Sequence, residues 1–185
     1  MPSDAEIAAE ILSEESTLRF TSFKSEDAVT IGMNLRKRFR ASLRHSRGRG
    51  AVISIQSVQG ATLFACAVGD GSDVCMDSWH RLEGIMRVTQ RTGHSSFYIE
   101  KGKNILAKSP EQLGLPFPEY RIEGGAFPIW LVNSPSVPLG TIGIYSGHSL
   151  DDHGMIASTL KHFFVKSGGN GGISLRQDSG SAEAA

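Results

Sequence analysis

Apolar residues recur every three to four positions in four stretches of the chain, which is the spacing that places them on one face of an α-helix. These stretches are residues 3–16, 25–43, 77–93 and 150–165. The second is the most regular, with Ala28, Ile31, Leu35 and Phe39 on one stripe and acidic residues near its start. The pattern therefore predicts four helices, each with one buried face.

Short stretches rich in β-branched and aromatic residues lie between these helices and predict strands. They span residues 17–23, 51–58, 61–68, 126–132 and 139–146. The second and third are separated only by Gln59 and Gly60, which favours a hairpin. Because hairpins supply most of the strands, we expect an α+β domain with a mainly antiparallel sheet of about five strands and flanking helices.

The periodicity weakens between residues 94 and 125, where three prolines interrupt the chain. We expect an irregular connection there, with a single helical turn at residues 109–115. A connection of this length in a compact domain is typically a functional loop or a disordered one.

The length of 185 residues fits one domain. We expect residues 1–166 to form a single α+β domain in which the helix at 4–15 is peripheral. Residues 167–185 are rich in Gly and Ser, which is typical of a disordered tail.

Charge and composition narrow the range of partners. The formal net charge is zero, so the chain has no overall attraction to nucleic acid or anionic membranes. Residues 36–49 carry seven bases and no acid, but the one aromatic residue among them, Phe39, belongs to the apolar stripe. We interpret this run as a solvated helix face and helix end, and expect no nucleic-acid partner.

Targeting signals and cysteine pairs are not evident. No apolar stretch approaches the ~20 residues that span a bilayer, and no basic-then-apolar leader precedes residue 20. Cys66 and Cys75 are too few and too far apart for a disulfide framework or a metal clip. We expect a cytoplasmic protein with reduced thiols and no membrane partner.

Residues 145–160, YSGHSLDDHGMIASTL, gather the most reactive side chains in the chain. Ser149 and Asp152 fit the S-x-x-D pattern of a capping box, so we expect Ser149 to cap a helix and Asp152 to fold back on it. His148 and His153 remain unexplained by capping. They are five residues apart rather than the four of a helical zinc pair, and we predict no metal site.

Two other motifs have structural explanations. The HSSFY sequence that starts at His94 lacks the strand–turn–helix setting of a nucleophilic serine, so we interpret it as turn and capping residues. Gly124 and Gly125 enter a predicted strand, where paired glycines indicate positive φ or a close approach of backbone. Pro128 lacks an N–H and predicts that this strand lies at an edge or is bulged.

The order of these motifs resembles a known family. A helix tryptophan, then HSS, then LGLPFPEYRIEGGAFPIWL, then GTIGIYSG with DDH is similar to the haem-degrading-domain (HbpS/GlcG-like) family, in its branch of small, largely uncharacterised cytosolic proteins of bacteria and fungi. The resemblance covers residues 16–165. It implies a profilin-like fold with a five-stranded antiparallel sheet and homo-oligomers built from dimers. Some relatives bind haem, and some of those degrade it or sense redox state.

The resemblance also implies a ligand pocket made of family-marked residues. These residues are Trp79, Arg81, Ser95, Ser96, Gly124, Gly125, Phe127, Ser146, Gly147, Asp152 and His153. The branch pattern places an Arg and a Lys after the tryptophan, whereas here Arg81 is followed by Leu82 and Glu83. This departure weakens the case for a two-base clamp on an anion such as a haem propionate, and the sequence assigns no iron ligand.

Three functions follow from these observations. We favour a non-enzymatic, oligomeric binding protein whose pocket takes a small ligand or a partner peptide, because capping already explains most of the reactive side chains. A haem-binding or haem-degrading protein is the first alternative. A small-molecule hydrolase that uses Ser146 or Ser95 with His153 is the second.

Overall fold

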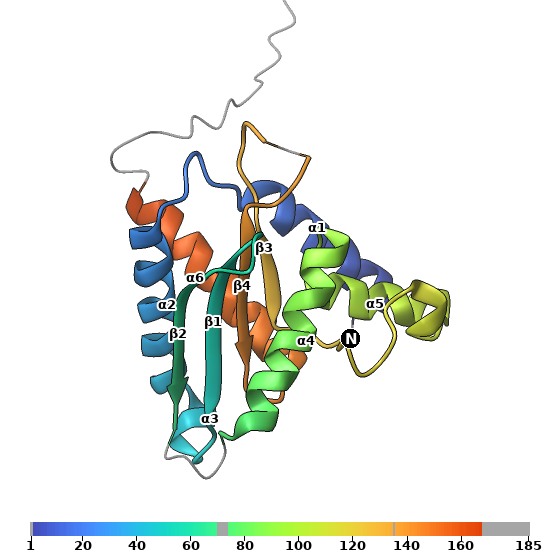
Figure 1. Cartoon of the computed structure of the whole chain (residues 1–185), viewed down its shortest axis with the longest axis horizontal. Coiled ribbons are helices and arrows are strands. Elements are labelled where there is room, and N and C mark those ends of the chain that lie inside the picture. The colour runs from blue at the N-terminus through green and yellow to red at the C-terminus, as the bar shows by residue number, and fades with distance from the viewer. Residues whose placement is uncertain (1, 70–73, 135, 168–185) are drawn as a thin grey trace, which may run out of the picture.

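A computed structural model describes residues 2–69, 74–134 and 136–167 (Figure 1). Of the tail expected at residues 167–185, only Ser167 falls within this range, as the last residue of a helix, and the rest lies outside the described residues. No helix in the described part of the chain combines the length and the apolar character that a membrane crossing requires.

The elements follow one another in a mixed order of helices and strands. The helices are α1 (Asp4–Thr17), α2 (Ser25–Arg40), α3 (Leu43–Ser46), α4 (Met76–Thr92), α5 (Ser96–Leu106) and α6 (Ser149–Ser167), with a 3₁₀ turn η1 (Glu111–Leu113). The strands are β1 (Ala51–Ser57), β2 (Thr62–Val68), β3 (Ala126–Ile129) and β4 (Gly140–Tyr145). The strands form one antiparallel sheet in the order β2-β1-β4-β3.

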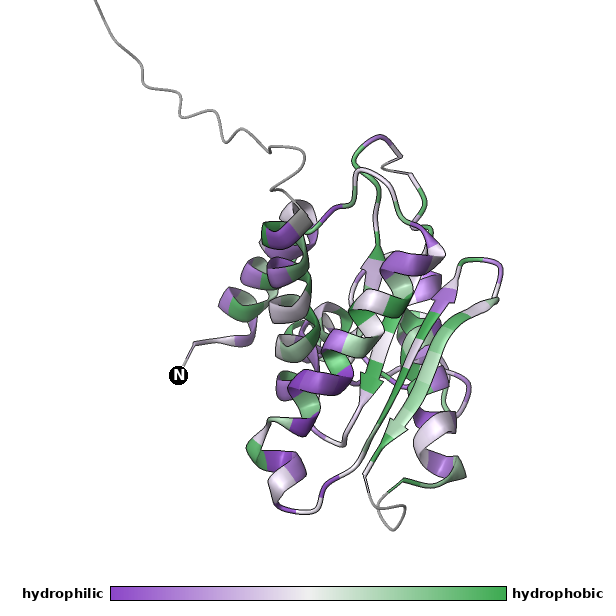
Figure 2. Cartoon of the chain, turned by 90° about the vertical axis from the view of Figure 1, so that its left-hand side faces the viewer, coloured by the Kyte–Doolittle hydropathy of each residue, from purple (hydrophilic) through white to green (hydrophobic). Residues whose placement is uncertain are grey.

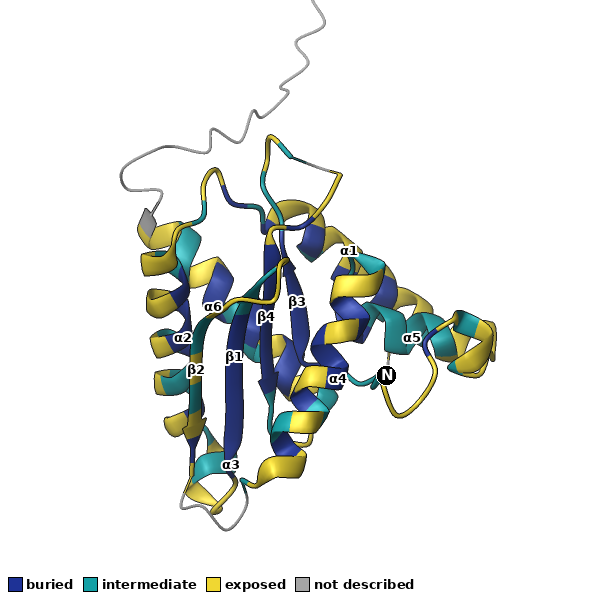
Figure 3. Cartoon of the chain, in the orientation of Figure 1, coloured by how far each residue is buried: buried dark blue, intermediate teal, exposed yellow. Residues whose placement is uncertain are grey.

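Helices cover both faces of the sheet. Helices α2 and α6 pack on one face, where the larger core includes Ile31, Leu35, Ile53 and Leu160. Helix α4 packs on the other face, and α1 lies against α5 beside it (Figure 1). Strands β1, β3 and β4 are therefore almost wholly buried, whereas the residues of β2 are mostly half-buried or exposed (Figure 3). The α+β class and the hairpin of β1 and β2 are confirmed.

The strand expected at residues 17–23 is wrong, so within the described residues the sheet has four strands rather than five. Only Phe20 joins β-type pairing, through a bridge to Leu131. Its aromatic ring is anchored in the core against Phe23, Phe163 and Phe164. Because α2 begins at Ser25, the segment leaves the sheet before it can extend the pairing.

The irregular connection expected at residues 94–125 is also corrected, because α5 occupies its first part. Only Ser96 and Phe97 of this helix are buried, which explains why its sequence shows little apolar periodicity. The expected helical turn at residues 109–115 is confirmed as η1.

Candidate functional site

The chain turns sharply between β4 and α6, and this corner is the centre of the candidate site. Strand β4 ends at Tyr145 and α6 begins at Ser149. Gly147 makes the turn with a φ of 82°, in the left-handed region that favours glycine. The turn leaves Ser146 and Gly147 facing a cavity rather than the core.

The buried carboxylate of Asp152 accepts hydrogen bonds from this corner. Its side chain is 1% exposed, and its Oδ2 accepts the backbone N–H of Ser146 at 2.9 Å. Its Oδ1 accepts the hydroxyl of Ser146, and the N–H of His148 lies 3.5 Å from Oδ2. Burial raises the pKa of Asp152 to about 6, and the hydrogen bonds from Ser146 and the charge of Arg44 oppose this rise.

Arg44 ties α3 to the same corner. Its Nη1 donates to Ser146 Oγ at 2.6 Å, and its Nη2 donates to the Ser146 carbonyl. The same Nη1 lies 3.6 Å from Asp152 Oδ1. The Ser146 hydroxyl therefore donates to a carboxylate and accepts from a guanidinium, which fixes its orientation.

Two adjoining cavities of about 280 and 510 Å³ lie at the corner and share Arg49, Ser146 and Gly147. We call them the corner pocket. Arg44, Arg47 and Arg49 line it from α3 and the loop that follows, and Arg81 lines it from α4.

Arginine is the most frequent residue type in the lining of the corner pocket, with four side chains. Asp77 is the one carboxylate among the described residues that line it. Arg81 donates from Nε to Asp77 at 2.6 Å, and its guanidinium lies 5.9 Å from the Tyr145 ring centroid. Four arginines line the pocket beside a glycine turn and a fixed hydroxyl, and two of them, Arg44 and Arg81, lie within ion-pair distance of Asp152 and Asp77. Several guanidinium groups around one turn form an arrangement suited to binding a small anion.

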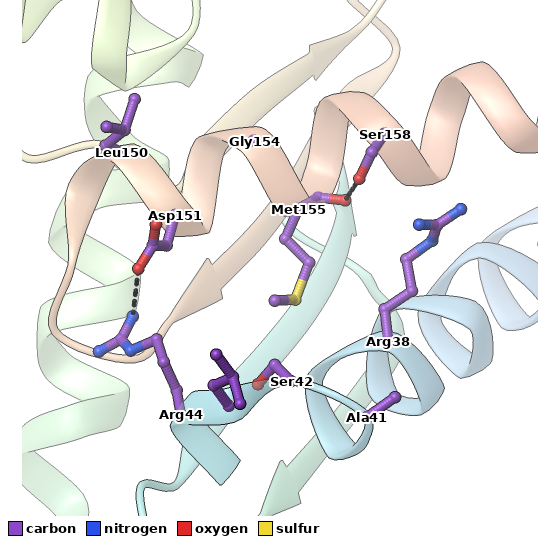
Figure 4. Close-up of a pocket in the computed structure, with 10 residues that line it drawn as sticks. Arg38, Ala41, Ser42, Arg44, Leu150, Asp151, Gly154, Met155 and Ser158 are labelled. Atoms are coloured by element: carbon purple, nitrogen blue, oxygen red, sulfur yellow. Dashed lines mark hydrogen bonds and ion pairs between the residues drawn. The ribbon is translucent and has the colours of Figure 1, made fainter. Parts of the chain in front are cut away.

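A larger groove lies on the other side of Arg44, between the end of α2, α3 and α6 (Figure 4). It has a volume of about 690 Å³. Its apolar lining includes Leu43, Leu150 and Met155, and the side chain of Met155 extends toward α3. Arg38 and Arg44 stand at its edges, and Arg44 Nη1 lies 3.9 Å from the carboxylate of Asp151, which also lines the groove.

His153 lies apart from both cavities. Its ring is 4% exposed and packs 5.1 Å from the Phe97 ring and 6.0 Å from the Phe127 ring. Its Nε2 lies 3.2 Å from Glu14 Oε2, while its Nδ1 has no hydrogen-bond partner among the described residues. Glu14 Oε1 also accepts from Lys161 at 2.6 Å. The His153 hydrogen bond, with that of Lys161, lowers the pKa of Glu14 to about 2.

Ser95 has the capping role expected of the HSSFY motif, but the helix that it caps, α5, was not predicted. Ser95 Oγ accepts the N–H of Tyr98 and caps α5, while Ser95 N donates to Glu15 Oε1 at 2.6 Å. Ser96 Oγ accepts the N–H of Ala126 at 3.0 Å. His94 Nδ1 lies 2.8 Å from Glu15 Oε2, and this hydrogen bond raises the pKa of His94.

The paired glycines are required by close packing of backbone. Gly125 has a φ of 132°, and a Cβ there would lie 2.3 Å from the Ile144 carbonyl oxygen. A Cβ on Gly124 would lie 2.6 Å from the Ser149 carbonyl oxygen. The close approach predicted for these glycines is therefore made by β4 and α6. Pro128 lies in β3, an edge strand as predicted.

The expected capping role of Ser149 is wrong. Helix α6 begins at Ser149 itself, and the Ser149 hydroxyl accepts the N–H of Gly124 at 2.9 Å. His148 takes the capping position, with its Nδ1 3.4 Å from the N–H of Asp151. Asp152 does fold back, but onto Ser146 and His148. The backbone at the start of β3 lies close enough to donate a hydrogen bond to the Ser149 hydroxyl, in place of the first N–H groups of α6. No local sequence pattern reveals this contact.

The structure divides the eleven residues expected to form the pocket. Arg81, Ser146 and Gly147 line the corner pocket, with Asp152 directly behind Ser146. Trp79 is half-buried against the smaller core cluster under α4. The others make internal contacts in the interior, and they are Ser95, Ser96, Gly124, Gly125, Phe127 and His153.

Three arginines of the corner pocket were missed by the sequence reasoning, namely Arg44, Arg47 and Arg49. Their signal was the basic run at residues 36–49, which we interpreted as a solvated surface. Neither Ser146 nor Ser95 is hydrogen-bonded to His153 in the described structure, so the geometry does not assemble the predicted hydrolase pair. The described residues hold no cluster of three or more His, Cys, Asp or Glu side chains that could bind a metal ion.

Comparisons with known proteins agree on a single family. The family described as "Haem degrading protein HbpS-like" matches residues 23–161. A UPF0303 protein of Edwardsiella ictaluri (strain 93-146) is 30% identical over 162 residues, which are 87% of this chain and 96% of the relative. The crystal structure of the Ybr137w protein matches with a TM-score of 0.77 at 25% identity, over 86% of this chain and 88% of that one. The crystal structure of a PduOC:Heme complex shares the fold, with a TM-score of 0.56 at 12% identity over 76% and 94% of the two chains.

Proposed function

The chain belongs to the HbpS-like family, as its motif order predicted, and from this premise we propose that it is a binding protein for a small anionic ligand held in the corner pocket. The observation that carries the proposal is the convergence of four arginines from two helices and a loop on Ser146 and Gly147. A carboxylate or phosphate group accepts several charge-assisted hydrogen bonds in such a pocket.

We favour binding over catalysis because the reactive groups already hold one another. The Ser146 hydroxyl is hydrogen-bonded to Asp152 and Arg44, and His153 is hydrogen-bonded to Glu14 of α1. A nucleophile needs a base within hydrogen-bond reach, and the described contacts of Ser146 include no histidine ring. We also propose that the protein is cytoplasmic and associates with itself, as expected from the sequence.

The anion site can be tested by calorimetric titration at fixed ionic strength with inorganic phosphate and with citrate as probes. The Arg81→Gln variant should bind the preferred probe about ten- to a hundredfold more weakly, because one charge-assisted hydrogen bond to an anion is worth about 1.5–3 kcal/mol. Arg87→Gln is the matched control, since Arg87 lies on the same helix and pairs with Glu83 at 2.7 Å in the same i,i+4 manner. Equal losses in the two variants, or no binding of either probe to the unaltered protein, would refute the anion site.

A second candidate function, haem binding, is favoured by the groove between α3 and α6. A haem needs apolar walls for its ring, and Leu43 and Leu150 supply them. Arg38 could pair with a propionate, and a methionine sulphur such as that of Met155 is an accepted axial ligand of haem iron. The residues present therefore fit the group in their chemistry.

Titration of the purified protein with haemin tests this second candidate. A saturable shift of the Soret band that changes in Met155→Leu, but not in the control Met33→Leu, would support it. A spectrum that stays that of free haemin at micromolar protein would exclude it. Native mass spectrometry of protein taken directly from cells would report the retained ligand and the oligomer together.

A further inference from the structure

The groove between α3 and α6 and the corner pocket are built largely from the same two stretches of chain. From the first stretch, residues 41–44 line the groove, and Arg44, Arg47 and Arg49 line the pocket. From the second, residues 146–148 line the pocket, and α6 lines the groove from Leu150 onward. Arg44 is the one described residue that lines both the groove and the pocket, so the two adjoin at its side chain.

The groove offers aliphatic surface that is exposed to water in the free protein. Leu43 and Leu150 line it and are 74% and 56% exposed, and the Met155 side chain extends toward α3 (Figure 4). The end of the molecule where α3 lies carries both hydrophilic and hydrophobic residues (Figure 2). No aromatic residue is among the described residues that line the groove, so a ring has no stacking partner there. An aliphatic chain in the groove would cover the exposed leucines, which is favourable.

The charged residues where the two cavities adjoin set the direction of a ligand. Figure 4 shows Asp151 and Arg44 at one end of the groove, with Met155 farther along it, and Arg44 Nη1 lies 3.9 Å from Asp151 Oδ2. The Asp151 carboxylate repels an anionic group placed inside the groove. On the pocket side, the guanidinium groups of Arg47 and Arg49 attract one. A ligand with a single anionic end therefore places that end in the corner pocket and its uncharged part in the groove.

Resting on the proposed anion site, we propose that the ligand is an amphiphilic anion, with a carboxylate or phosphate head group on an unbranched aliphatic chain. The head group accepts hydrogen bonds in the corner pocket beside Ser146, and the chain lies in the groove between Leu43 and α6. From Asp151 to Ser158 the helix rises by about 10 Å, at roughly 1.5 Å per residue, and this length limits the chain. Such a ligand is an alternative to haem, because each of them fills the groove.

Calorimetric titration at fixed ionic strength tests the proposal with two series of probes, each kept below its micelle concentration. One series runs from inorganic phosphate through butyl, hexyl and octyl phosphate to dodecyl phosphate, and the other runs from acetate through the fatty acids of matching length. In at least one series the dissociation constant should fall roughly twofold to fourfold for each added methylene. The fall should stop when the chain exceeds about 10 Å.

The outcomes separate this inference from the anion site on which it rests. Inorganic phosphate or acetate bound as tightly as the longer probes would overturn the amphiphilic ligand and support the anion site alone. An affinity that rises without limit to the longest chain would indicate nonspecific adsorption and would also overturn the amphiphilic ligand. No binding in either series would overturn both proposals.

Leu150→Ser tests whether the chain lies in the groove. This variant should weaken the binding of octyl phosphate roughly threefold more than that of inorganic phosphate, because Leu150 contacts the chain and not the head group. Leu106→Ser is the matched control, since Leu106 is 57% exposed at the end of α5 and lines neither the groove nor the pocket. Arg81→Gln should weaken all the phosphate probes by the same factor. Far-UV circular dichroism establishes that each variant is folded, and equal effects of the two leucine variants on octyl phosphate would contradict this position of the chain.

Discussion

Two carboxylates in this protein have opposite responses to their surroundings. Asp152 is almost fully buried, and desolvation raises its pKa to about 6 although it accepts hydrogen bonds from Ser146. Glu14 is partly exposed, and its hydrogen bonds from His153 and Lys161 lower its pKa to about 2. Desolvation dominates in the first case and hydrogen bonding in the second, so the two residues should respond oppositely to pH.

The pKa of Asp152 predicts a loss of stability as the pH rises through about 4 to 6. In that range the folded protein holds a proton that the unfolded chain has released, so the free energy of unfolding falls with pH. The change from 3.8 to about 6 corresponds to roughly 3 kcal/mol. Between pH 4 and pH 7, the free energy of unfolding measured in urea should fall by about 2–3 kcal/mol less for Asp152→Asn than for the unaltered protein. Parallel pH profiles for the two proteins would contradict this assignment.

Glu14 predicts the opposite trend at lower pH. Its depressed pKa gives stability that is present above pH 4.5 and is lost as the pH falls toward 2. Glu14→Gln should therefore lower the free energy of unfolding at pH 7 by about 1 kcal/mol, a value reduced because the Lys161 arm of the cluster is exposed to solvent. Glu10→Gln, an exposed change on the same helix, should have almost no effect. Equal effects in the two variants would remove the special role of Glu14.

At the scale of elements, the entry to β3 is packed directly against β4 and α6. Gly124 donates its N–H to Ser149 Oγ, and the Gly125 carbonyl accepts the N–H of Ile144 at 2.8 Å. The strand, the corner and the first turn of α6 are thus one packed unit. A side chain at this junction would force apart the elements that position Asp152 and Ser146.

Gly125→Ala should be strongly destabilising, by roughly 3 kcal/mol or more, because it combines backbone strain with a steric clash. Gly154→Ala is the control, since a Cβ there meets no atom within 4 Å and alanine in a helix should add about 0.5–1 kcal/mol. Thermal and urea unfolding of the two variants measure both effects. Similar stabilities for the two variants would show that the corner can relax around a side chain.

At the scale of the whole molecule, the corner pocket and the groove between α3 and α6 are neighbouring surfaces with different chemistry. Four arginine side chains line the pocket, whereas Leu43, Leu150 and Met155 give the groove an apolar wall. Salt screens the first far more than the second. Added salt should therefore weaken the binding of an anion in the pocket more than the binding of an apolar ligand in the groove.

Self-association also predicts that thermal stability depends on concentration. If the native dimer dissociates on unfolding, the melting temperature should rise with protein concentration. A melting temperature that does not change with the concentration of unaltered protein would count against the dimer.

The sequence by itself determined the α+β class, four helices, the β1–β2 hairpin, the edge position of Pro128 and the family. Each of these rests on local spacing or on motif order, which a single chain displays directly. It also marked Arg81, Ser146 and Gly147, which line one pocket in the structure. Helix α5 escaped prediction because only one end of it is buried, and local periodicity records burial rather than helix formation.

Only the tertiary structure decided which polar residues meet. Arg44 and Ser146 are 102 residues apart in the chain, and Glu14 and His153 are 139 apart. Such contacts depend on how helices cross the sheet, which local patterns do not encode. From its sequence, the basic run at residues 36–49 therefore resembles a solvated surface. The fold places three of its arginines at the β4–α6 corner. In the same way, the approach of the β3 entry engaged Ser149 and left the helix cap to His148.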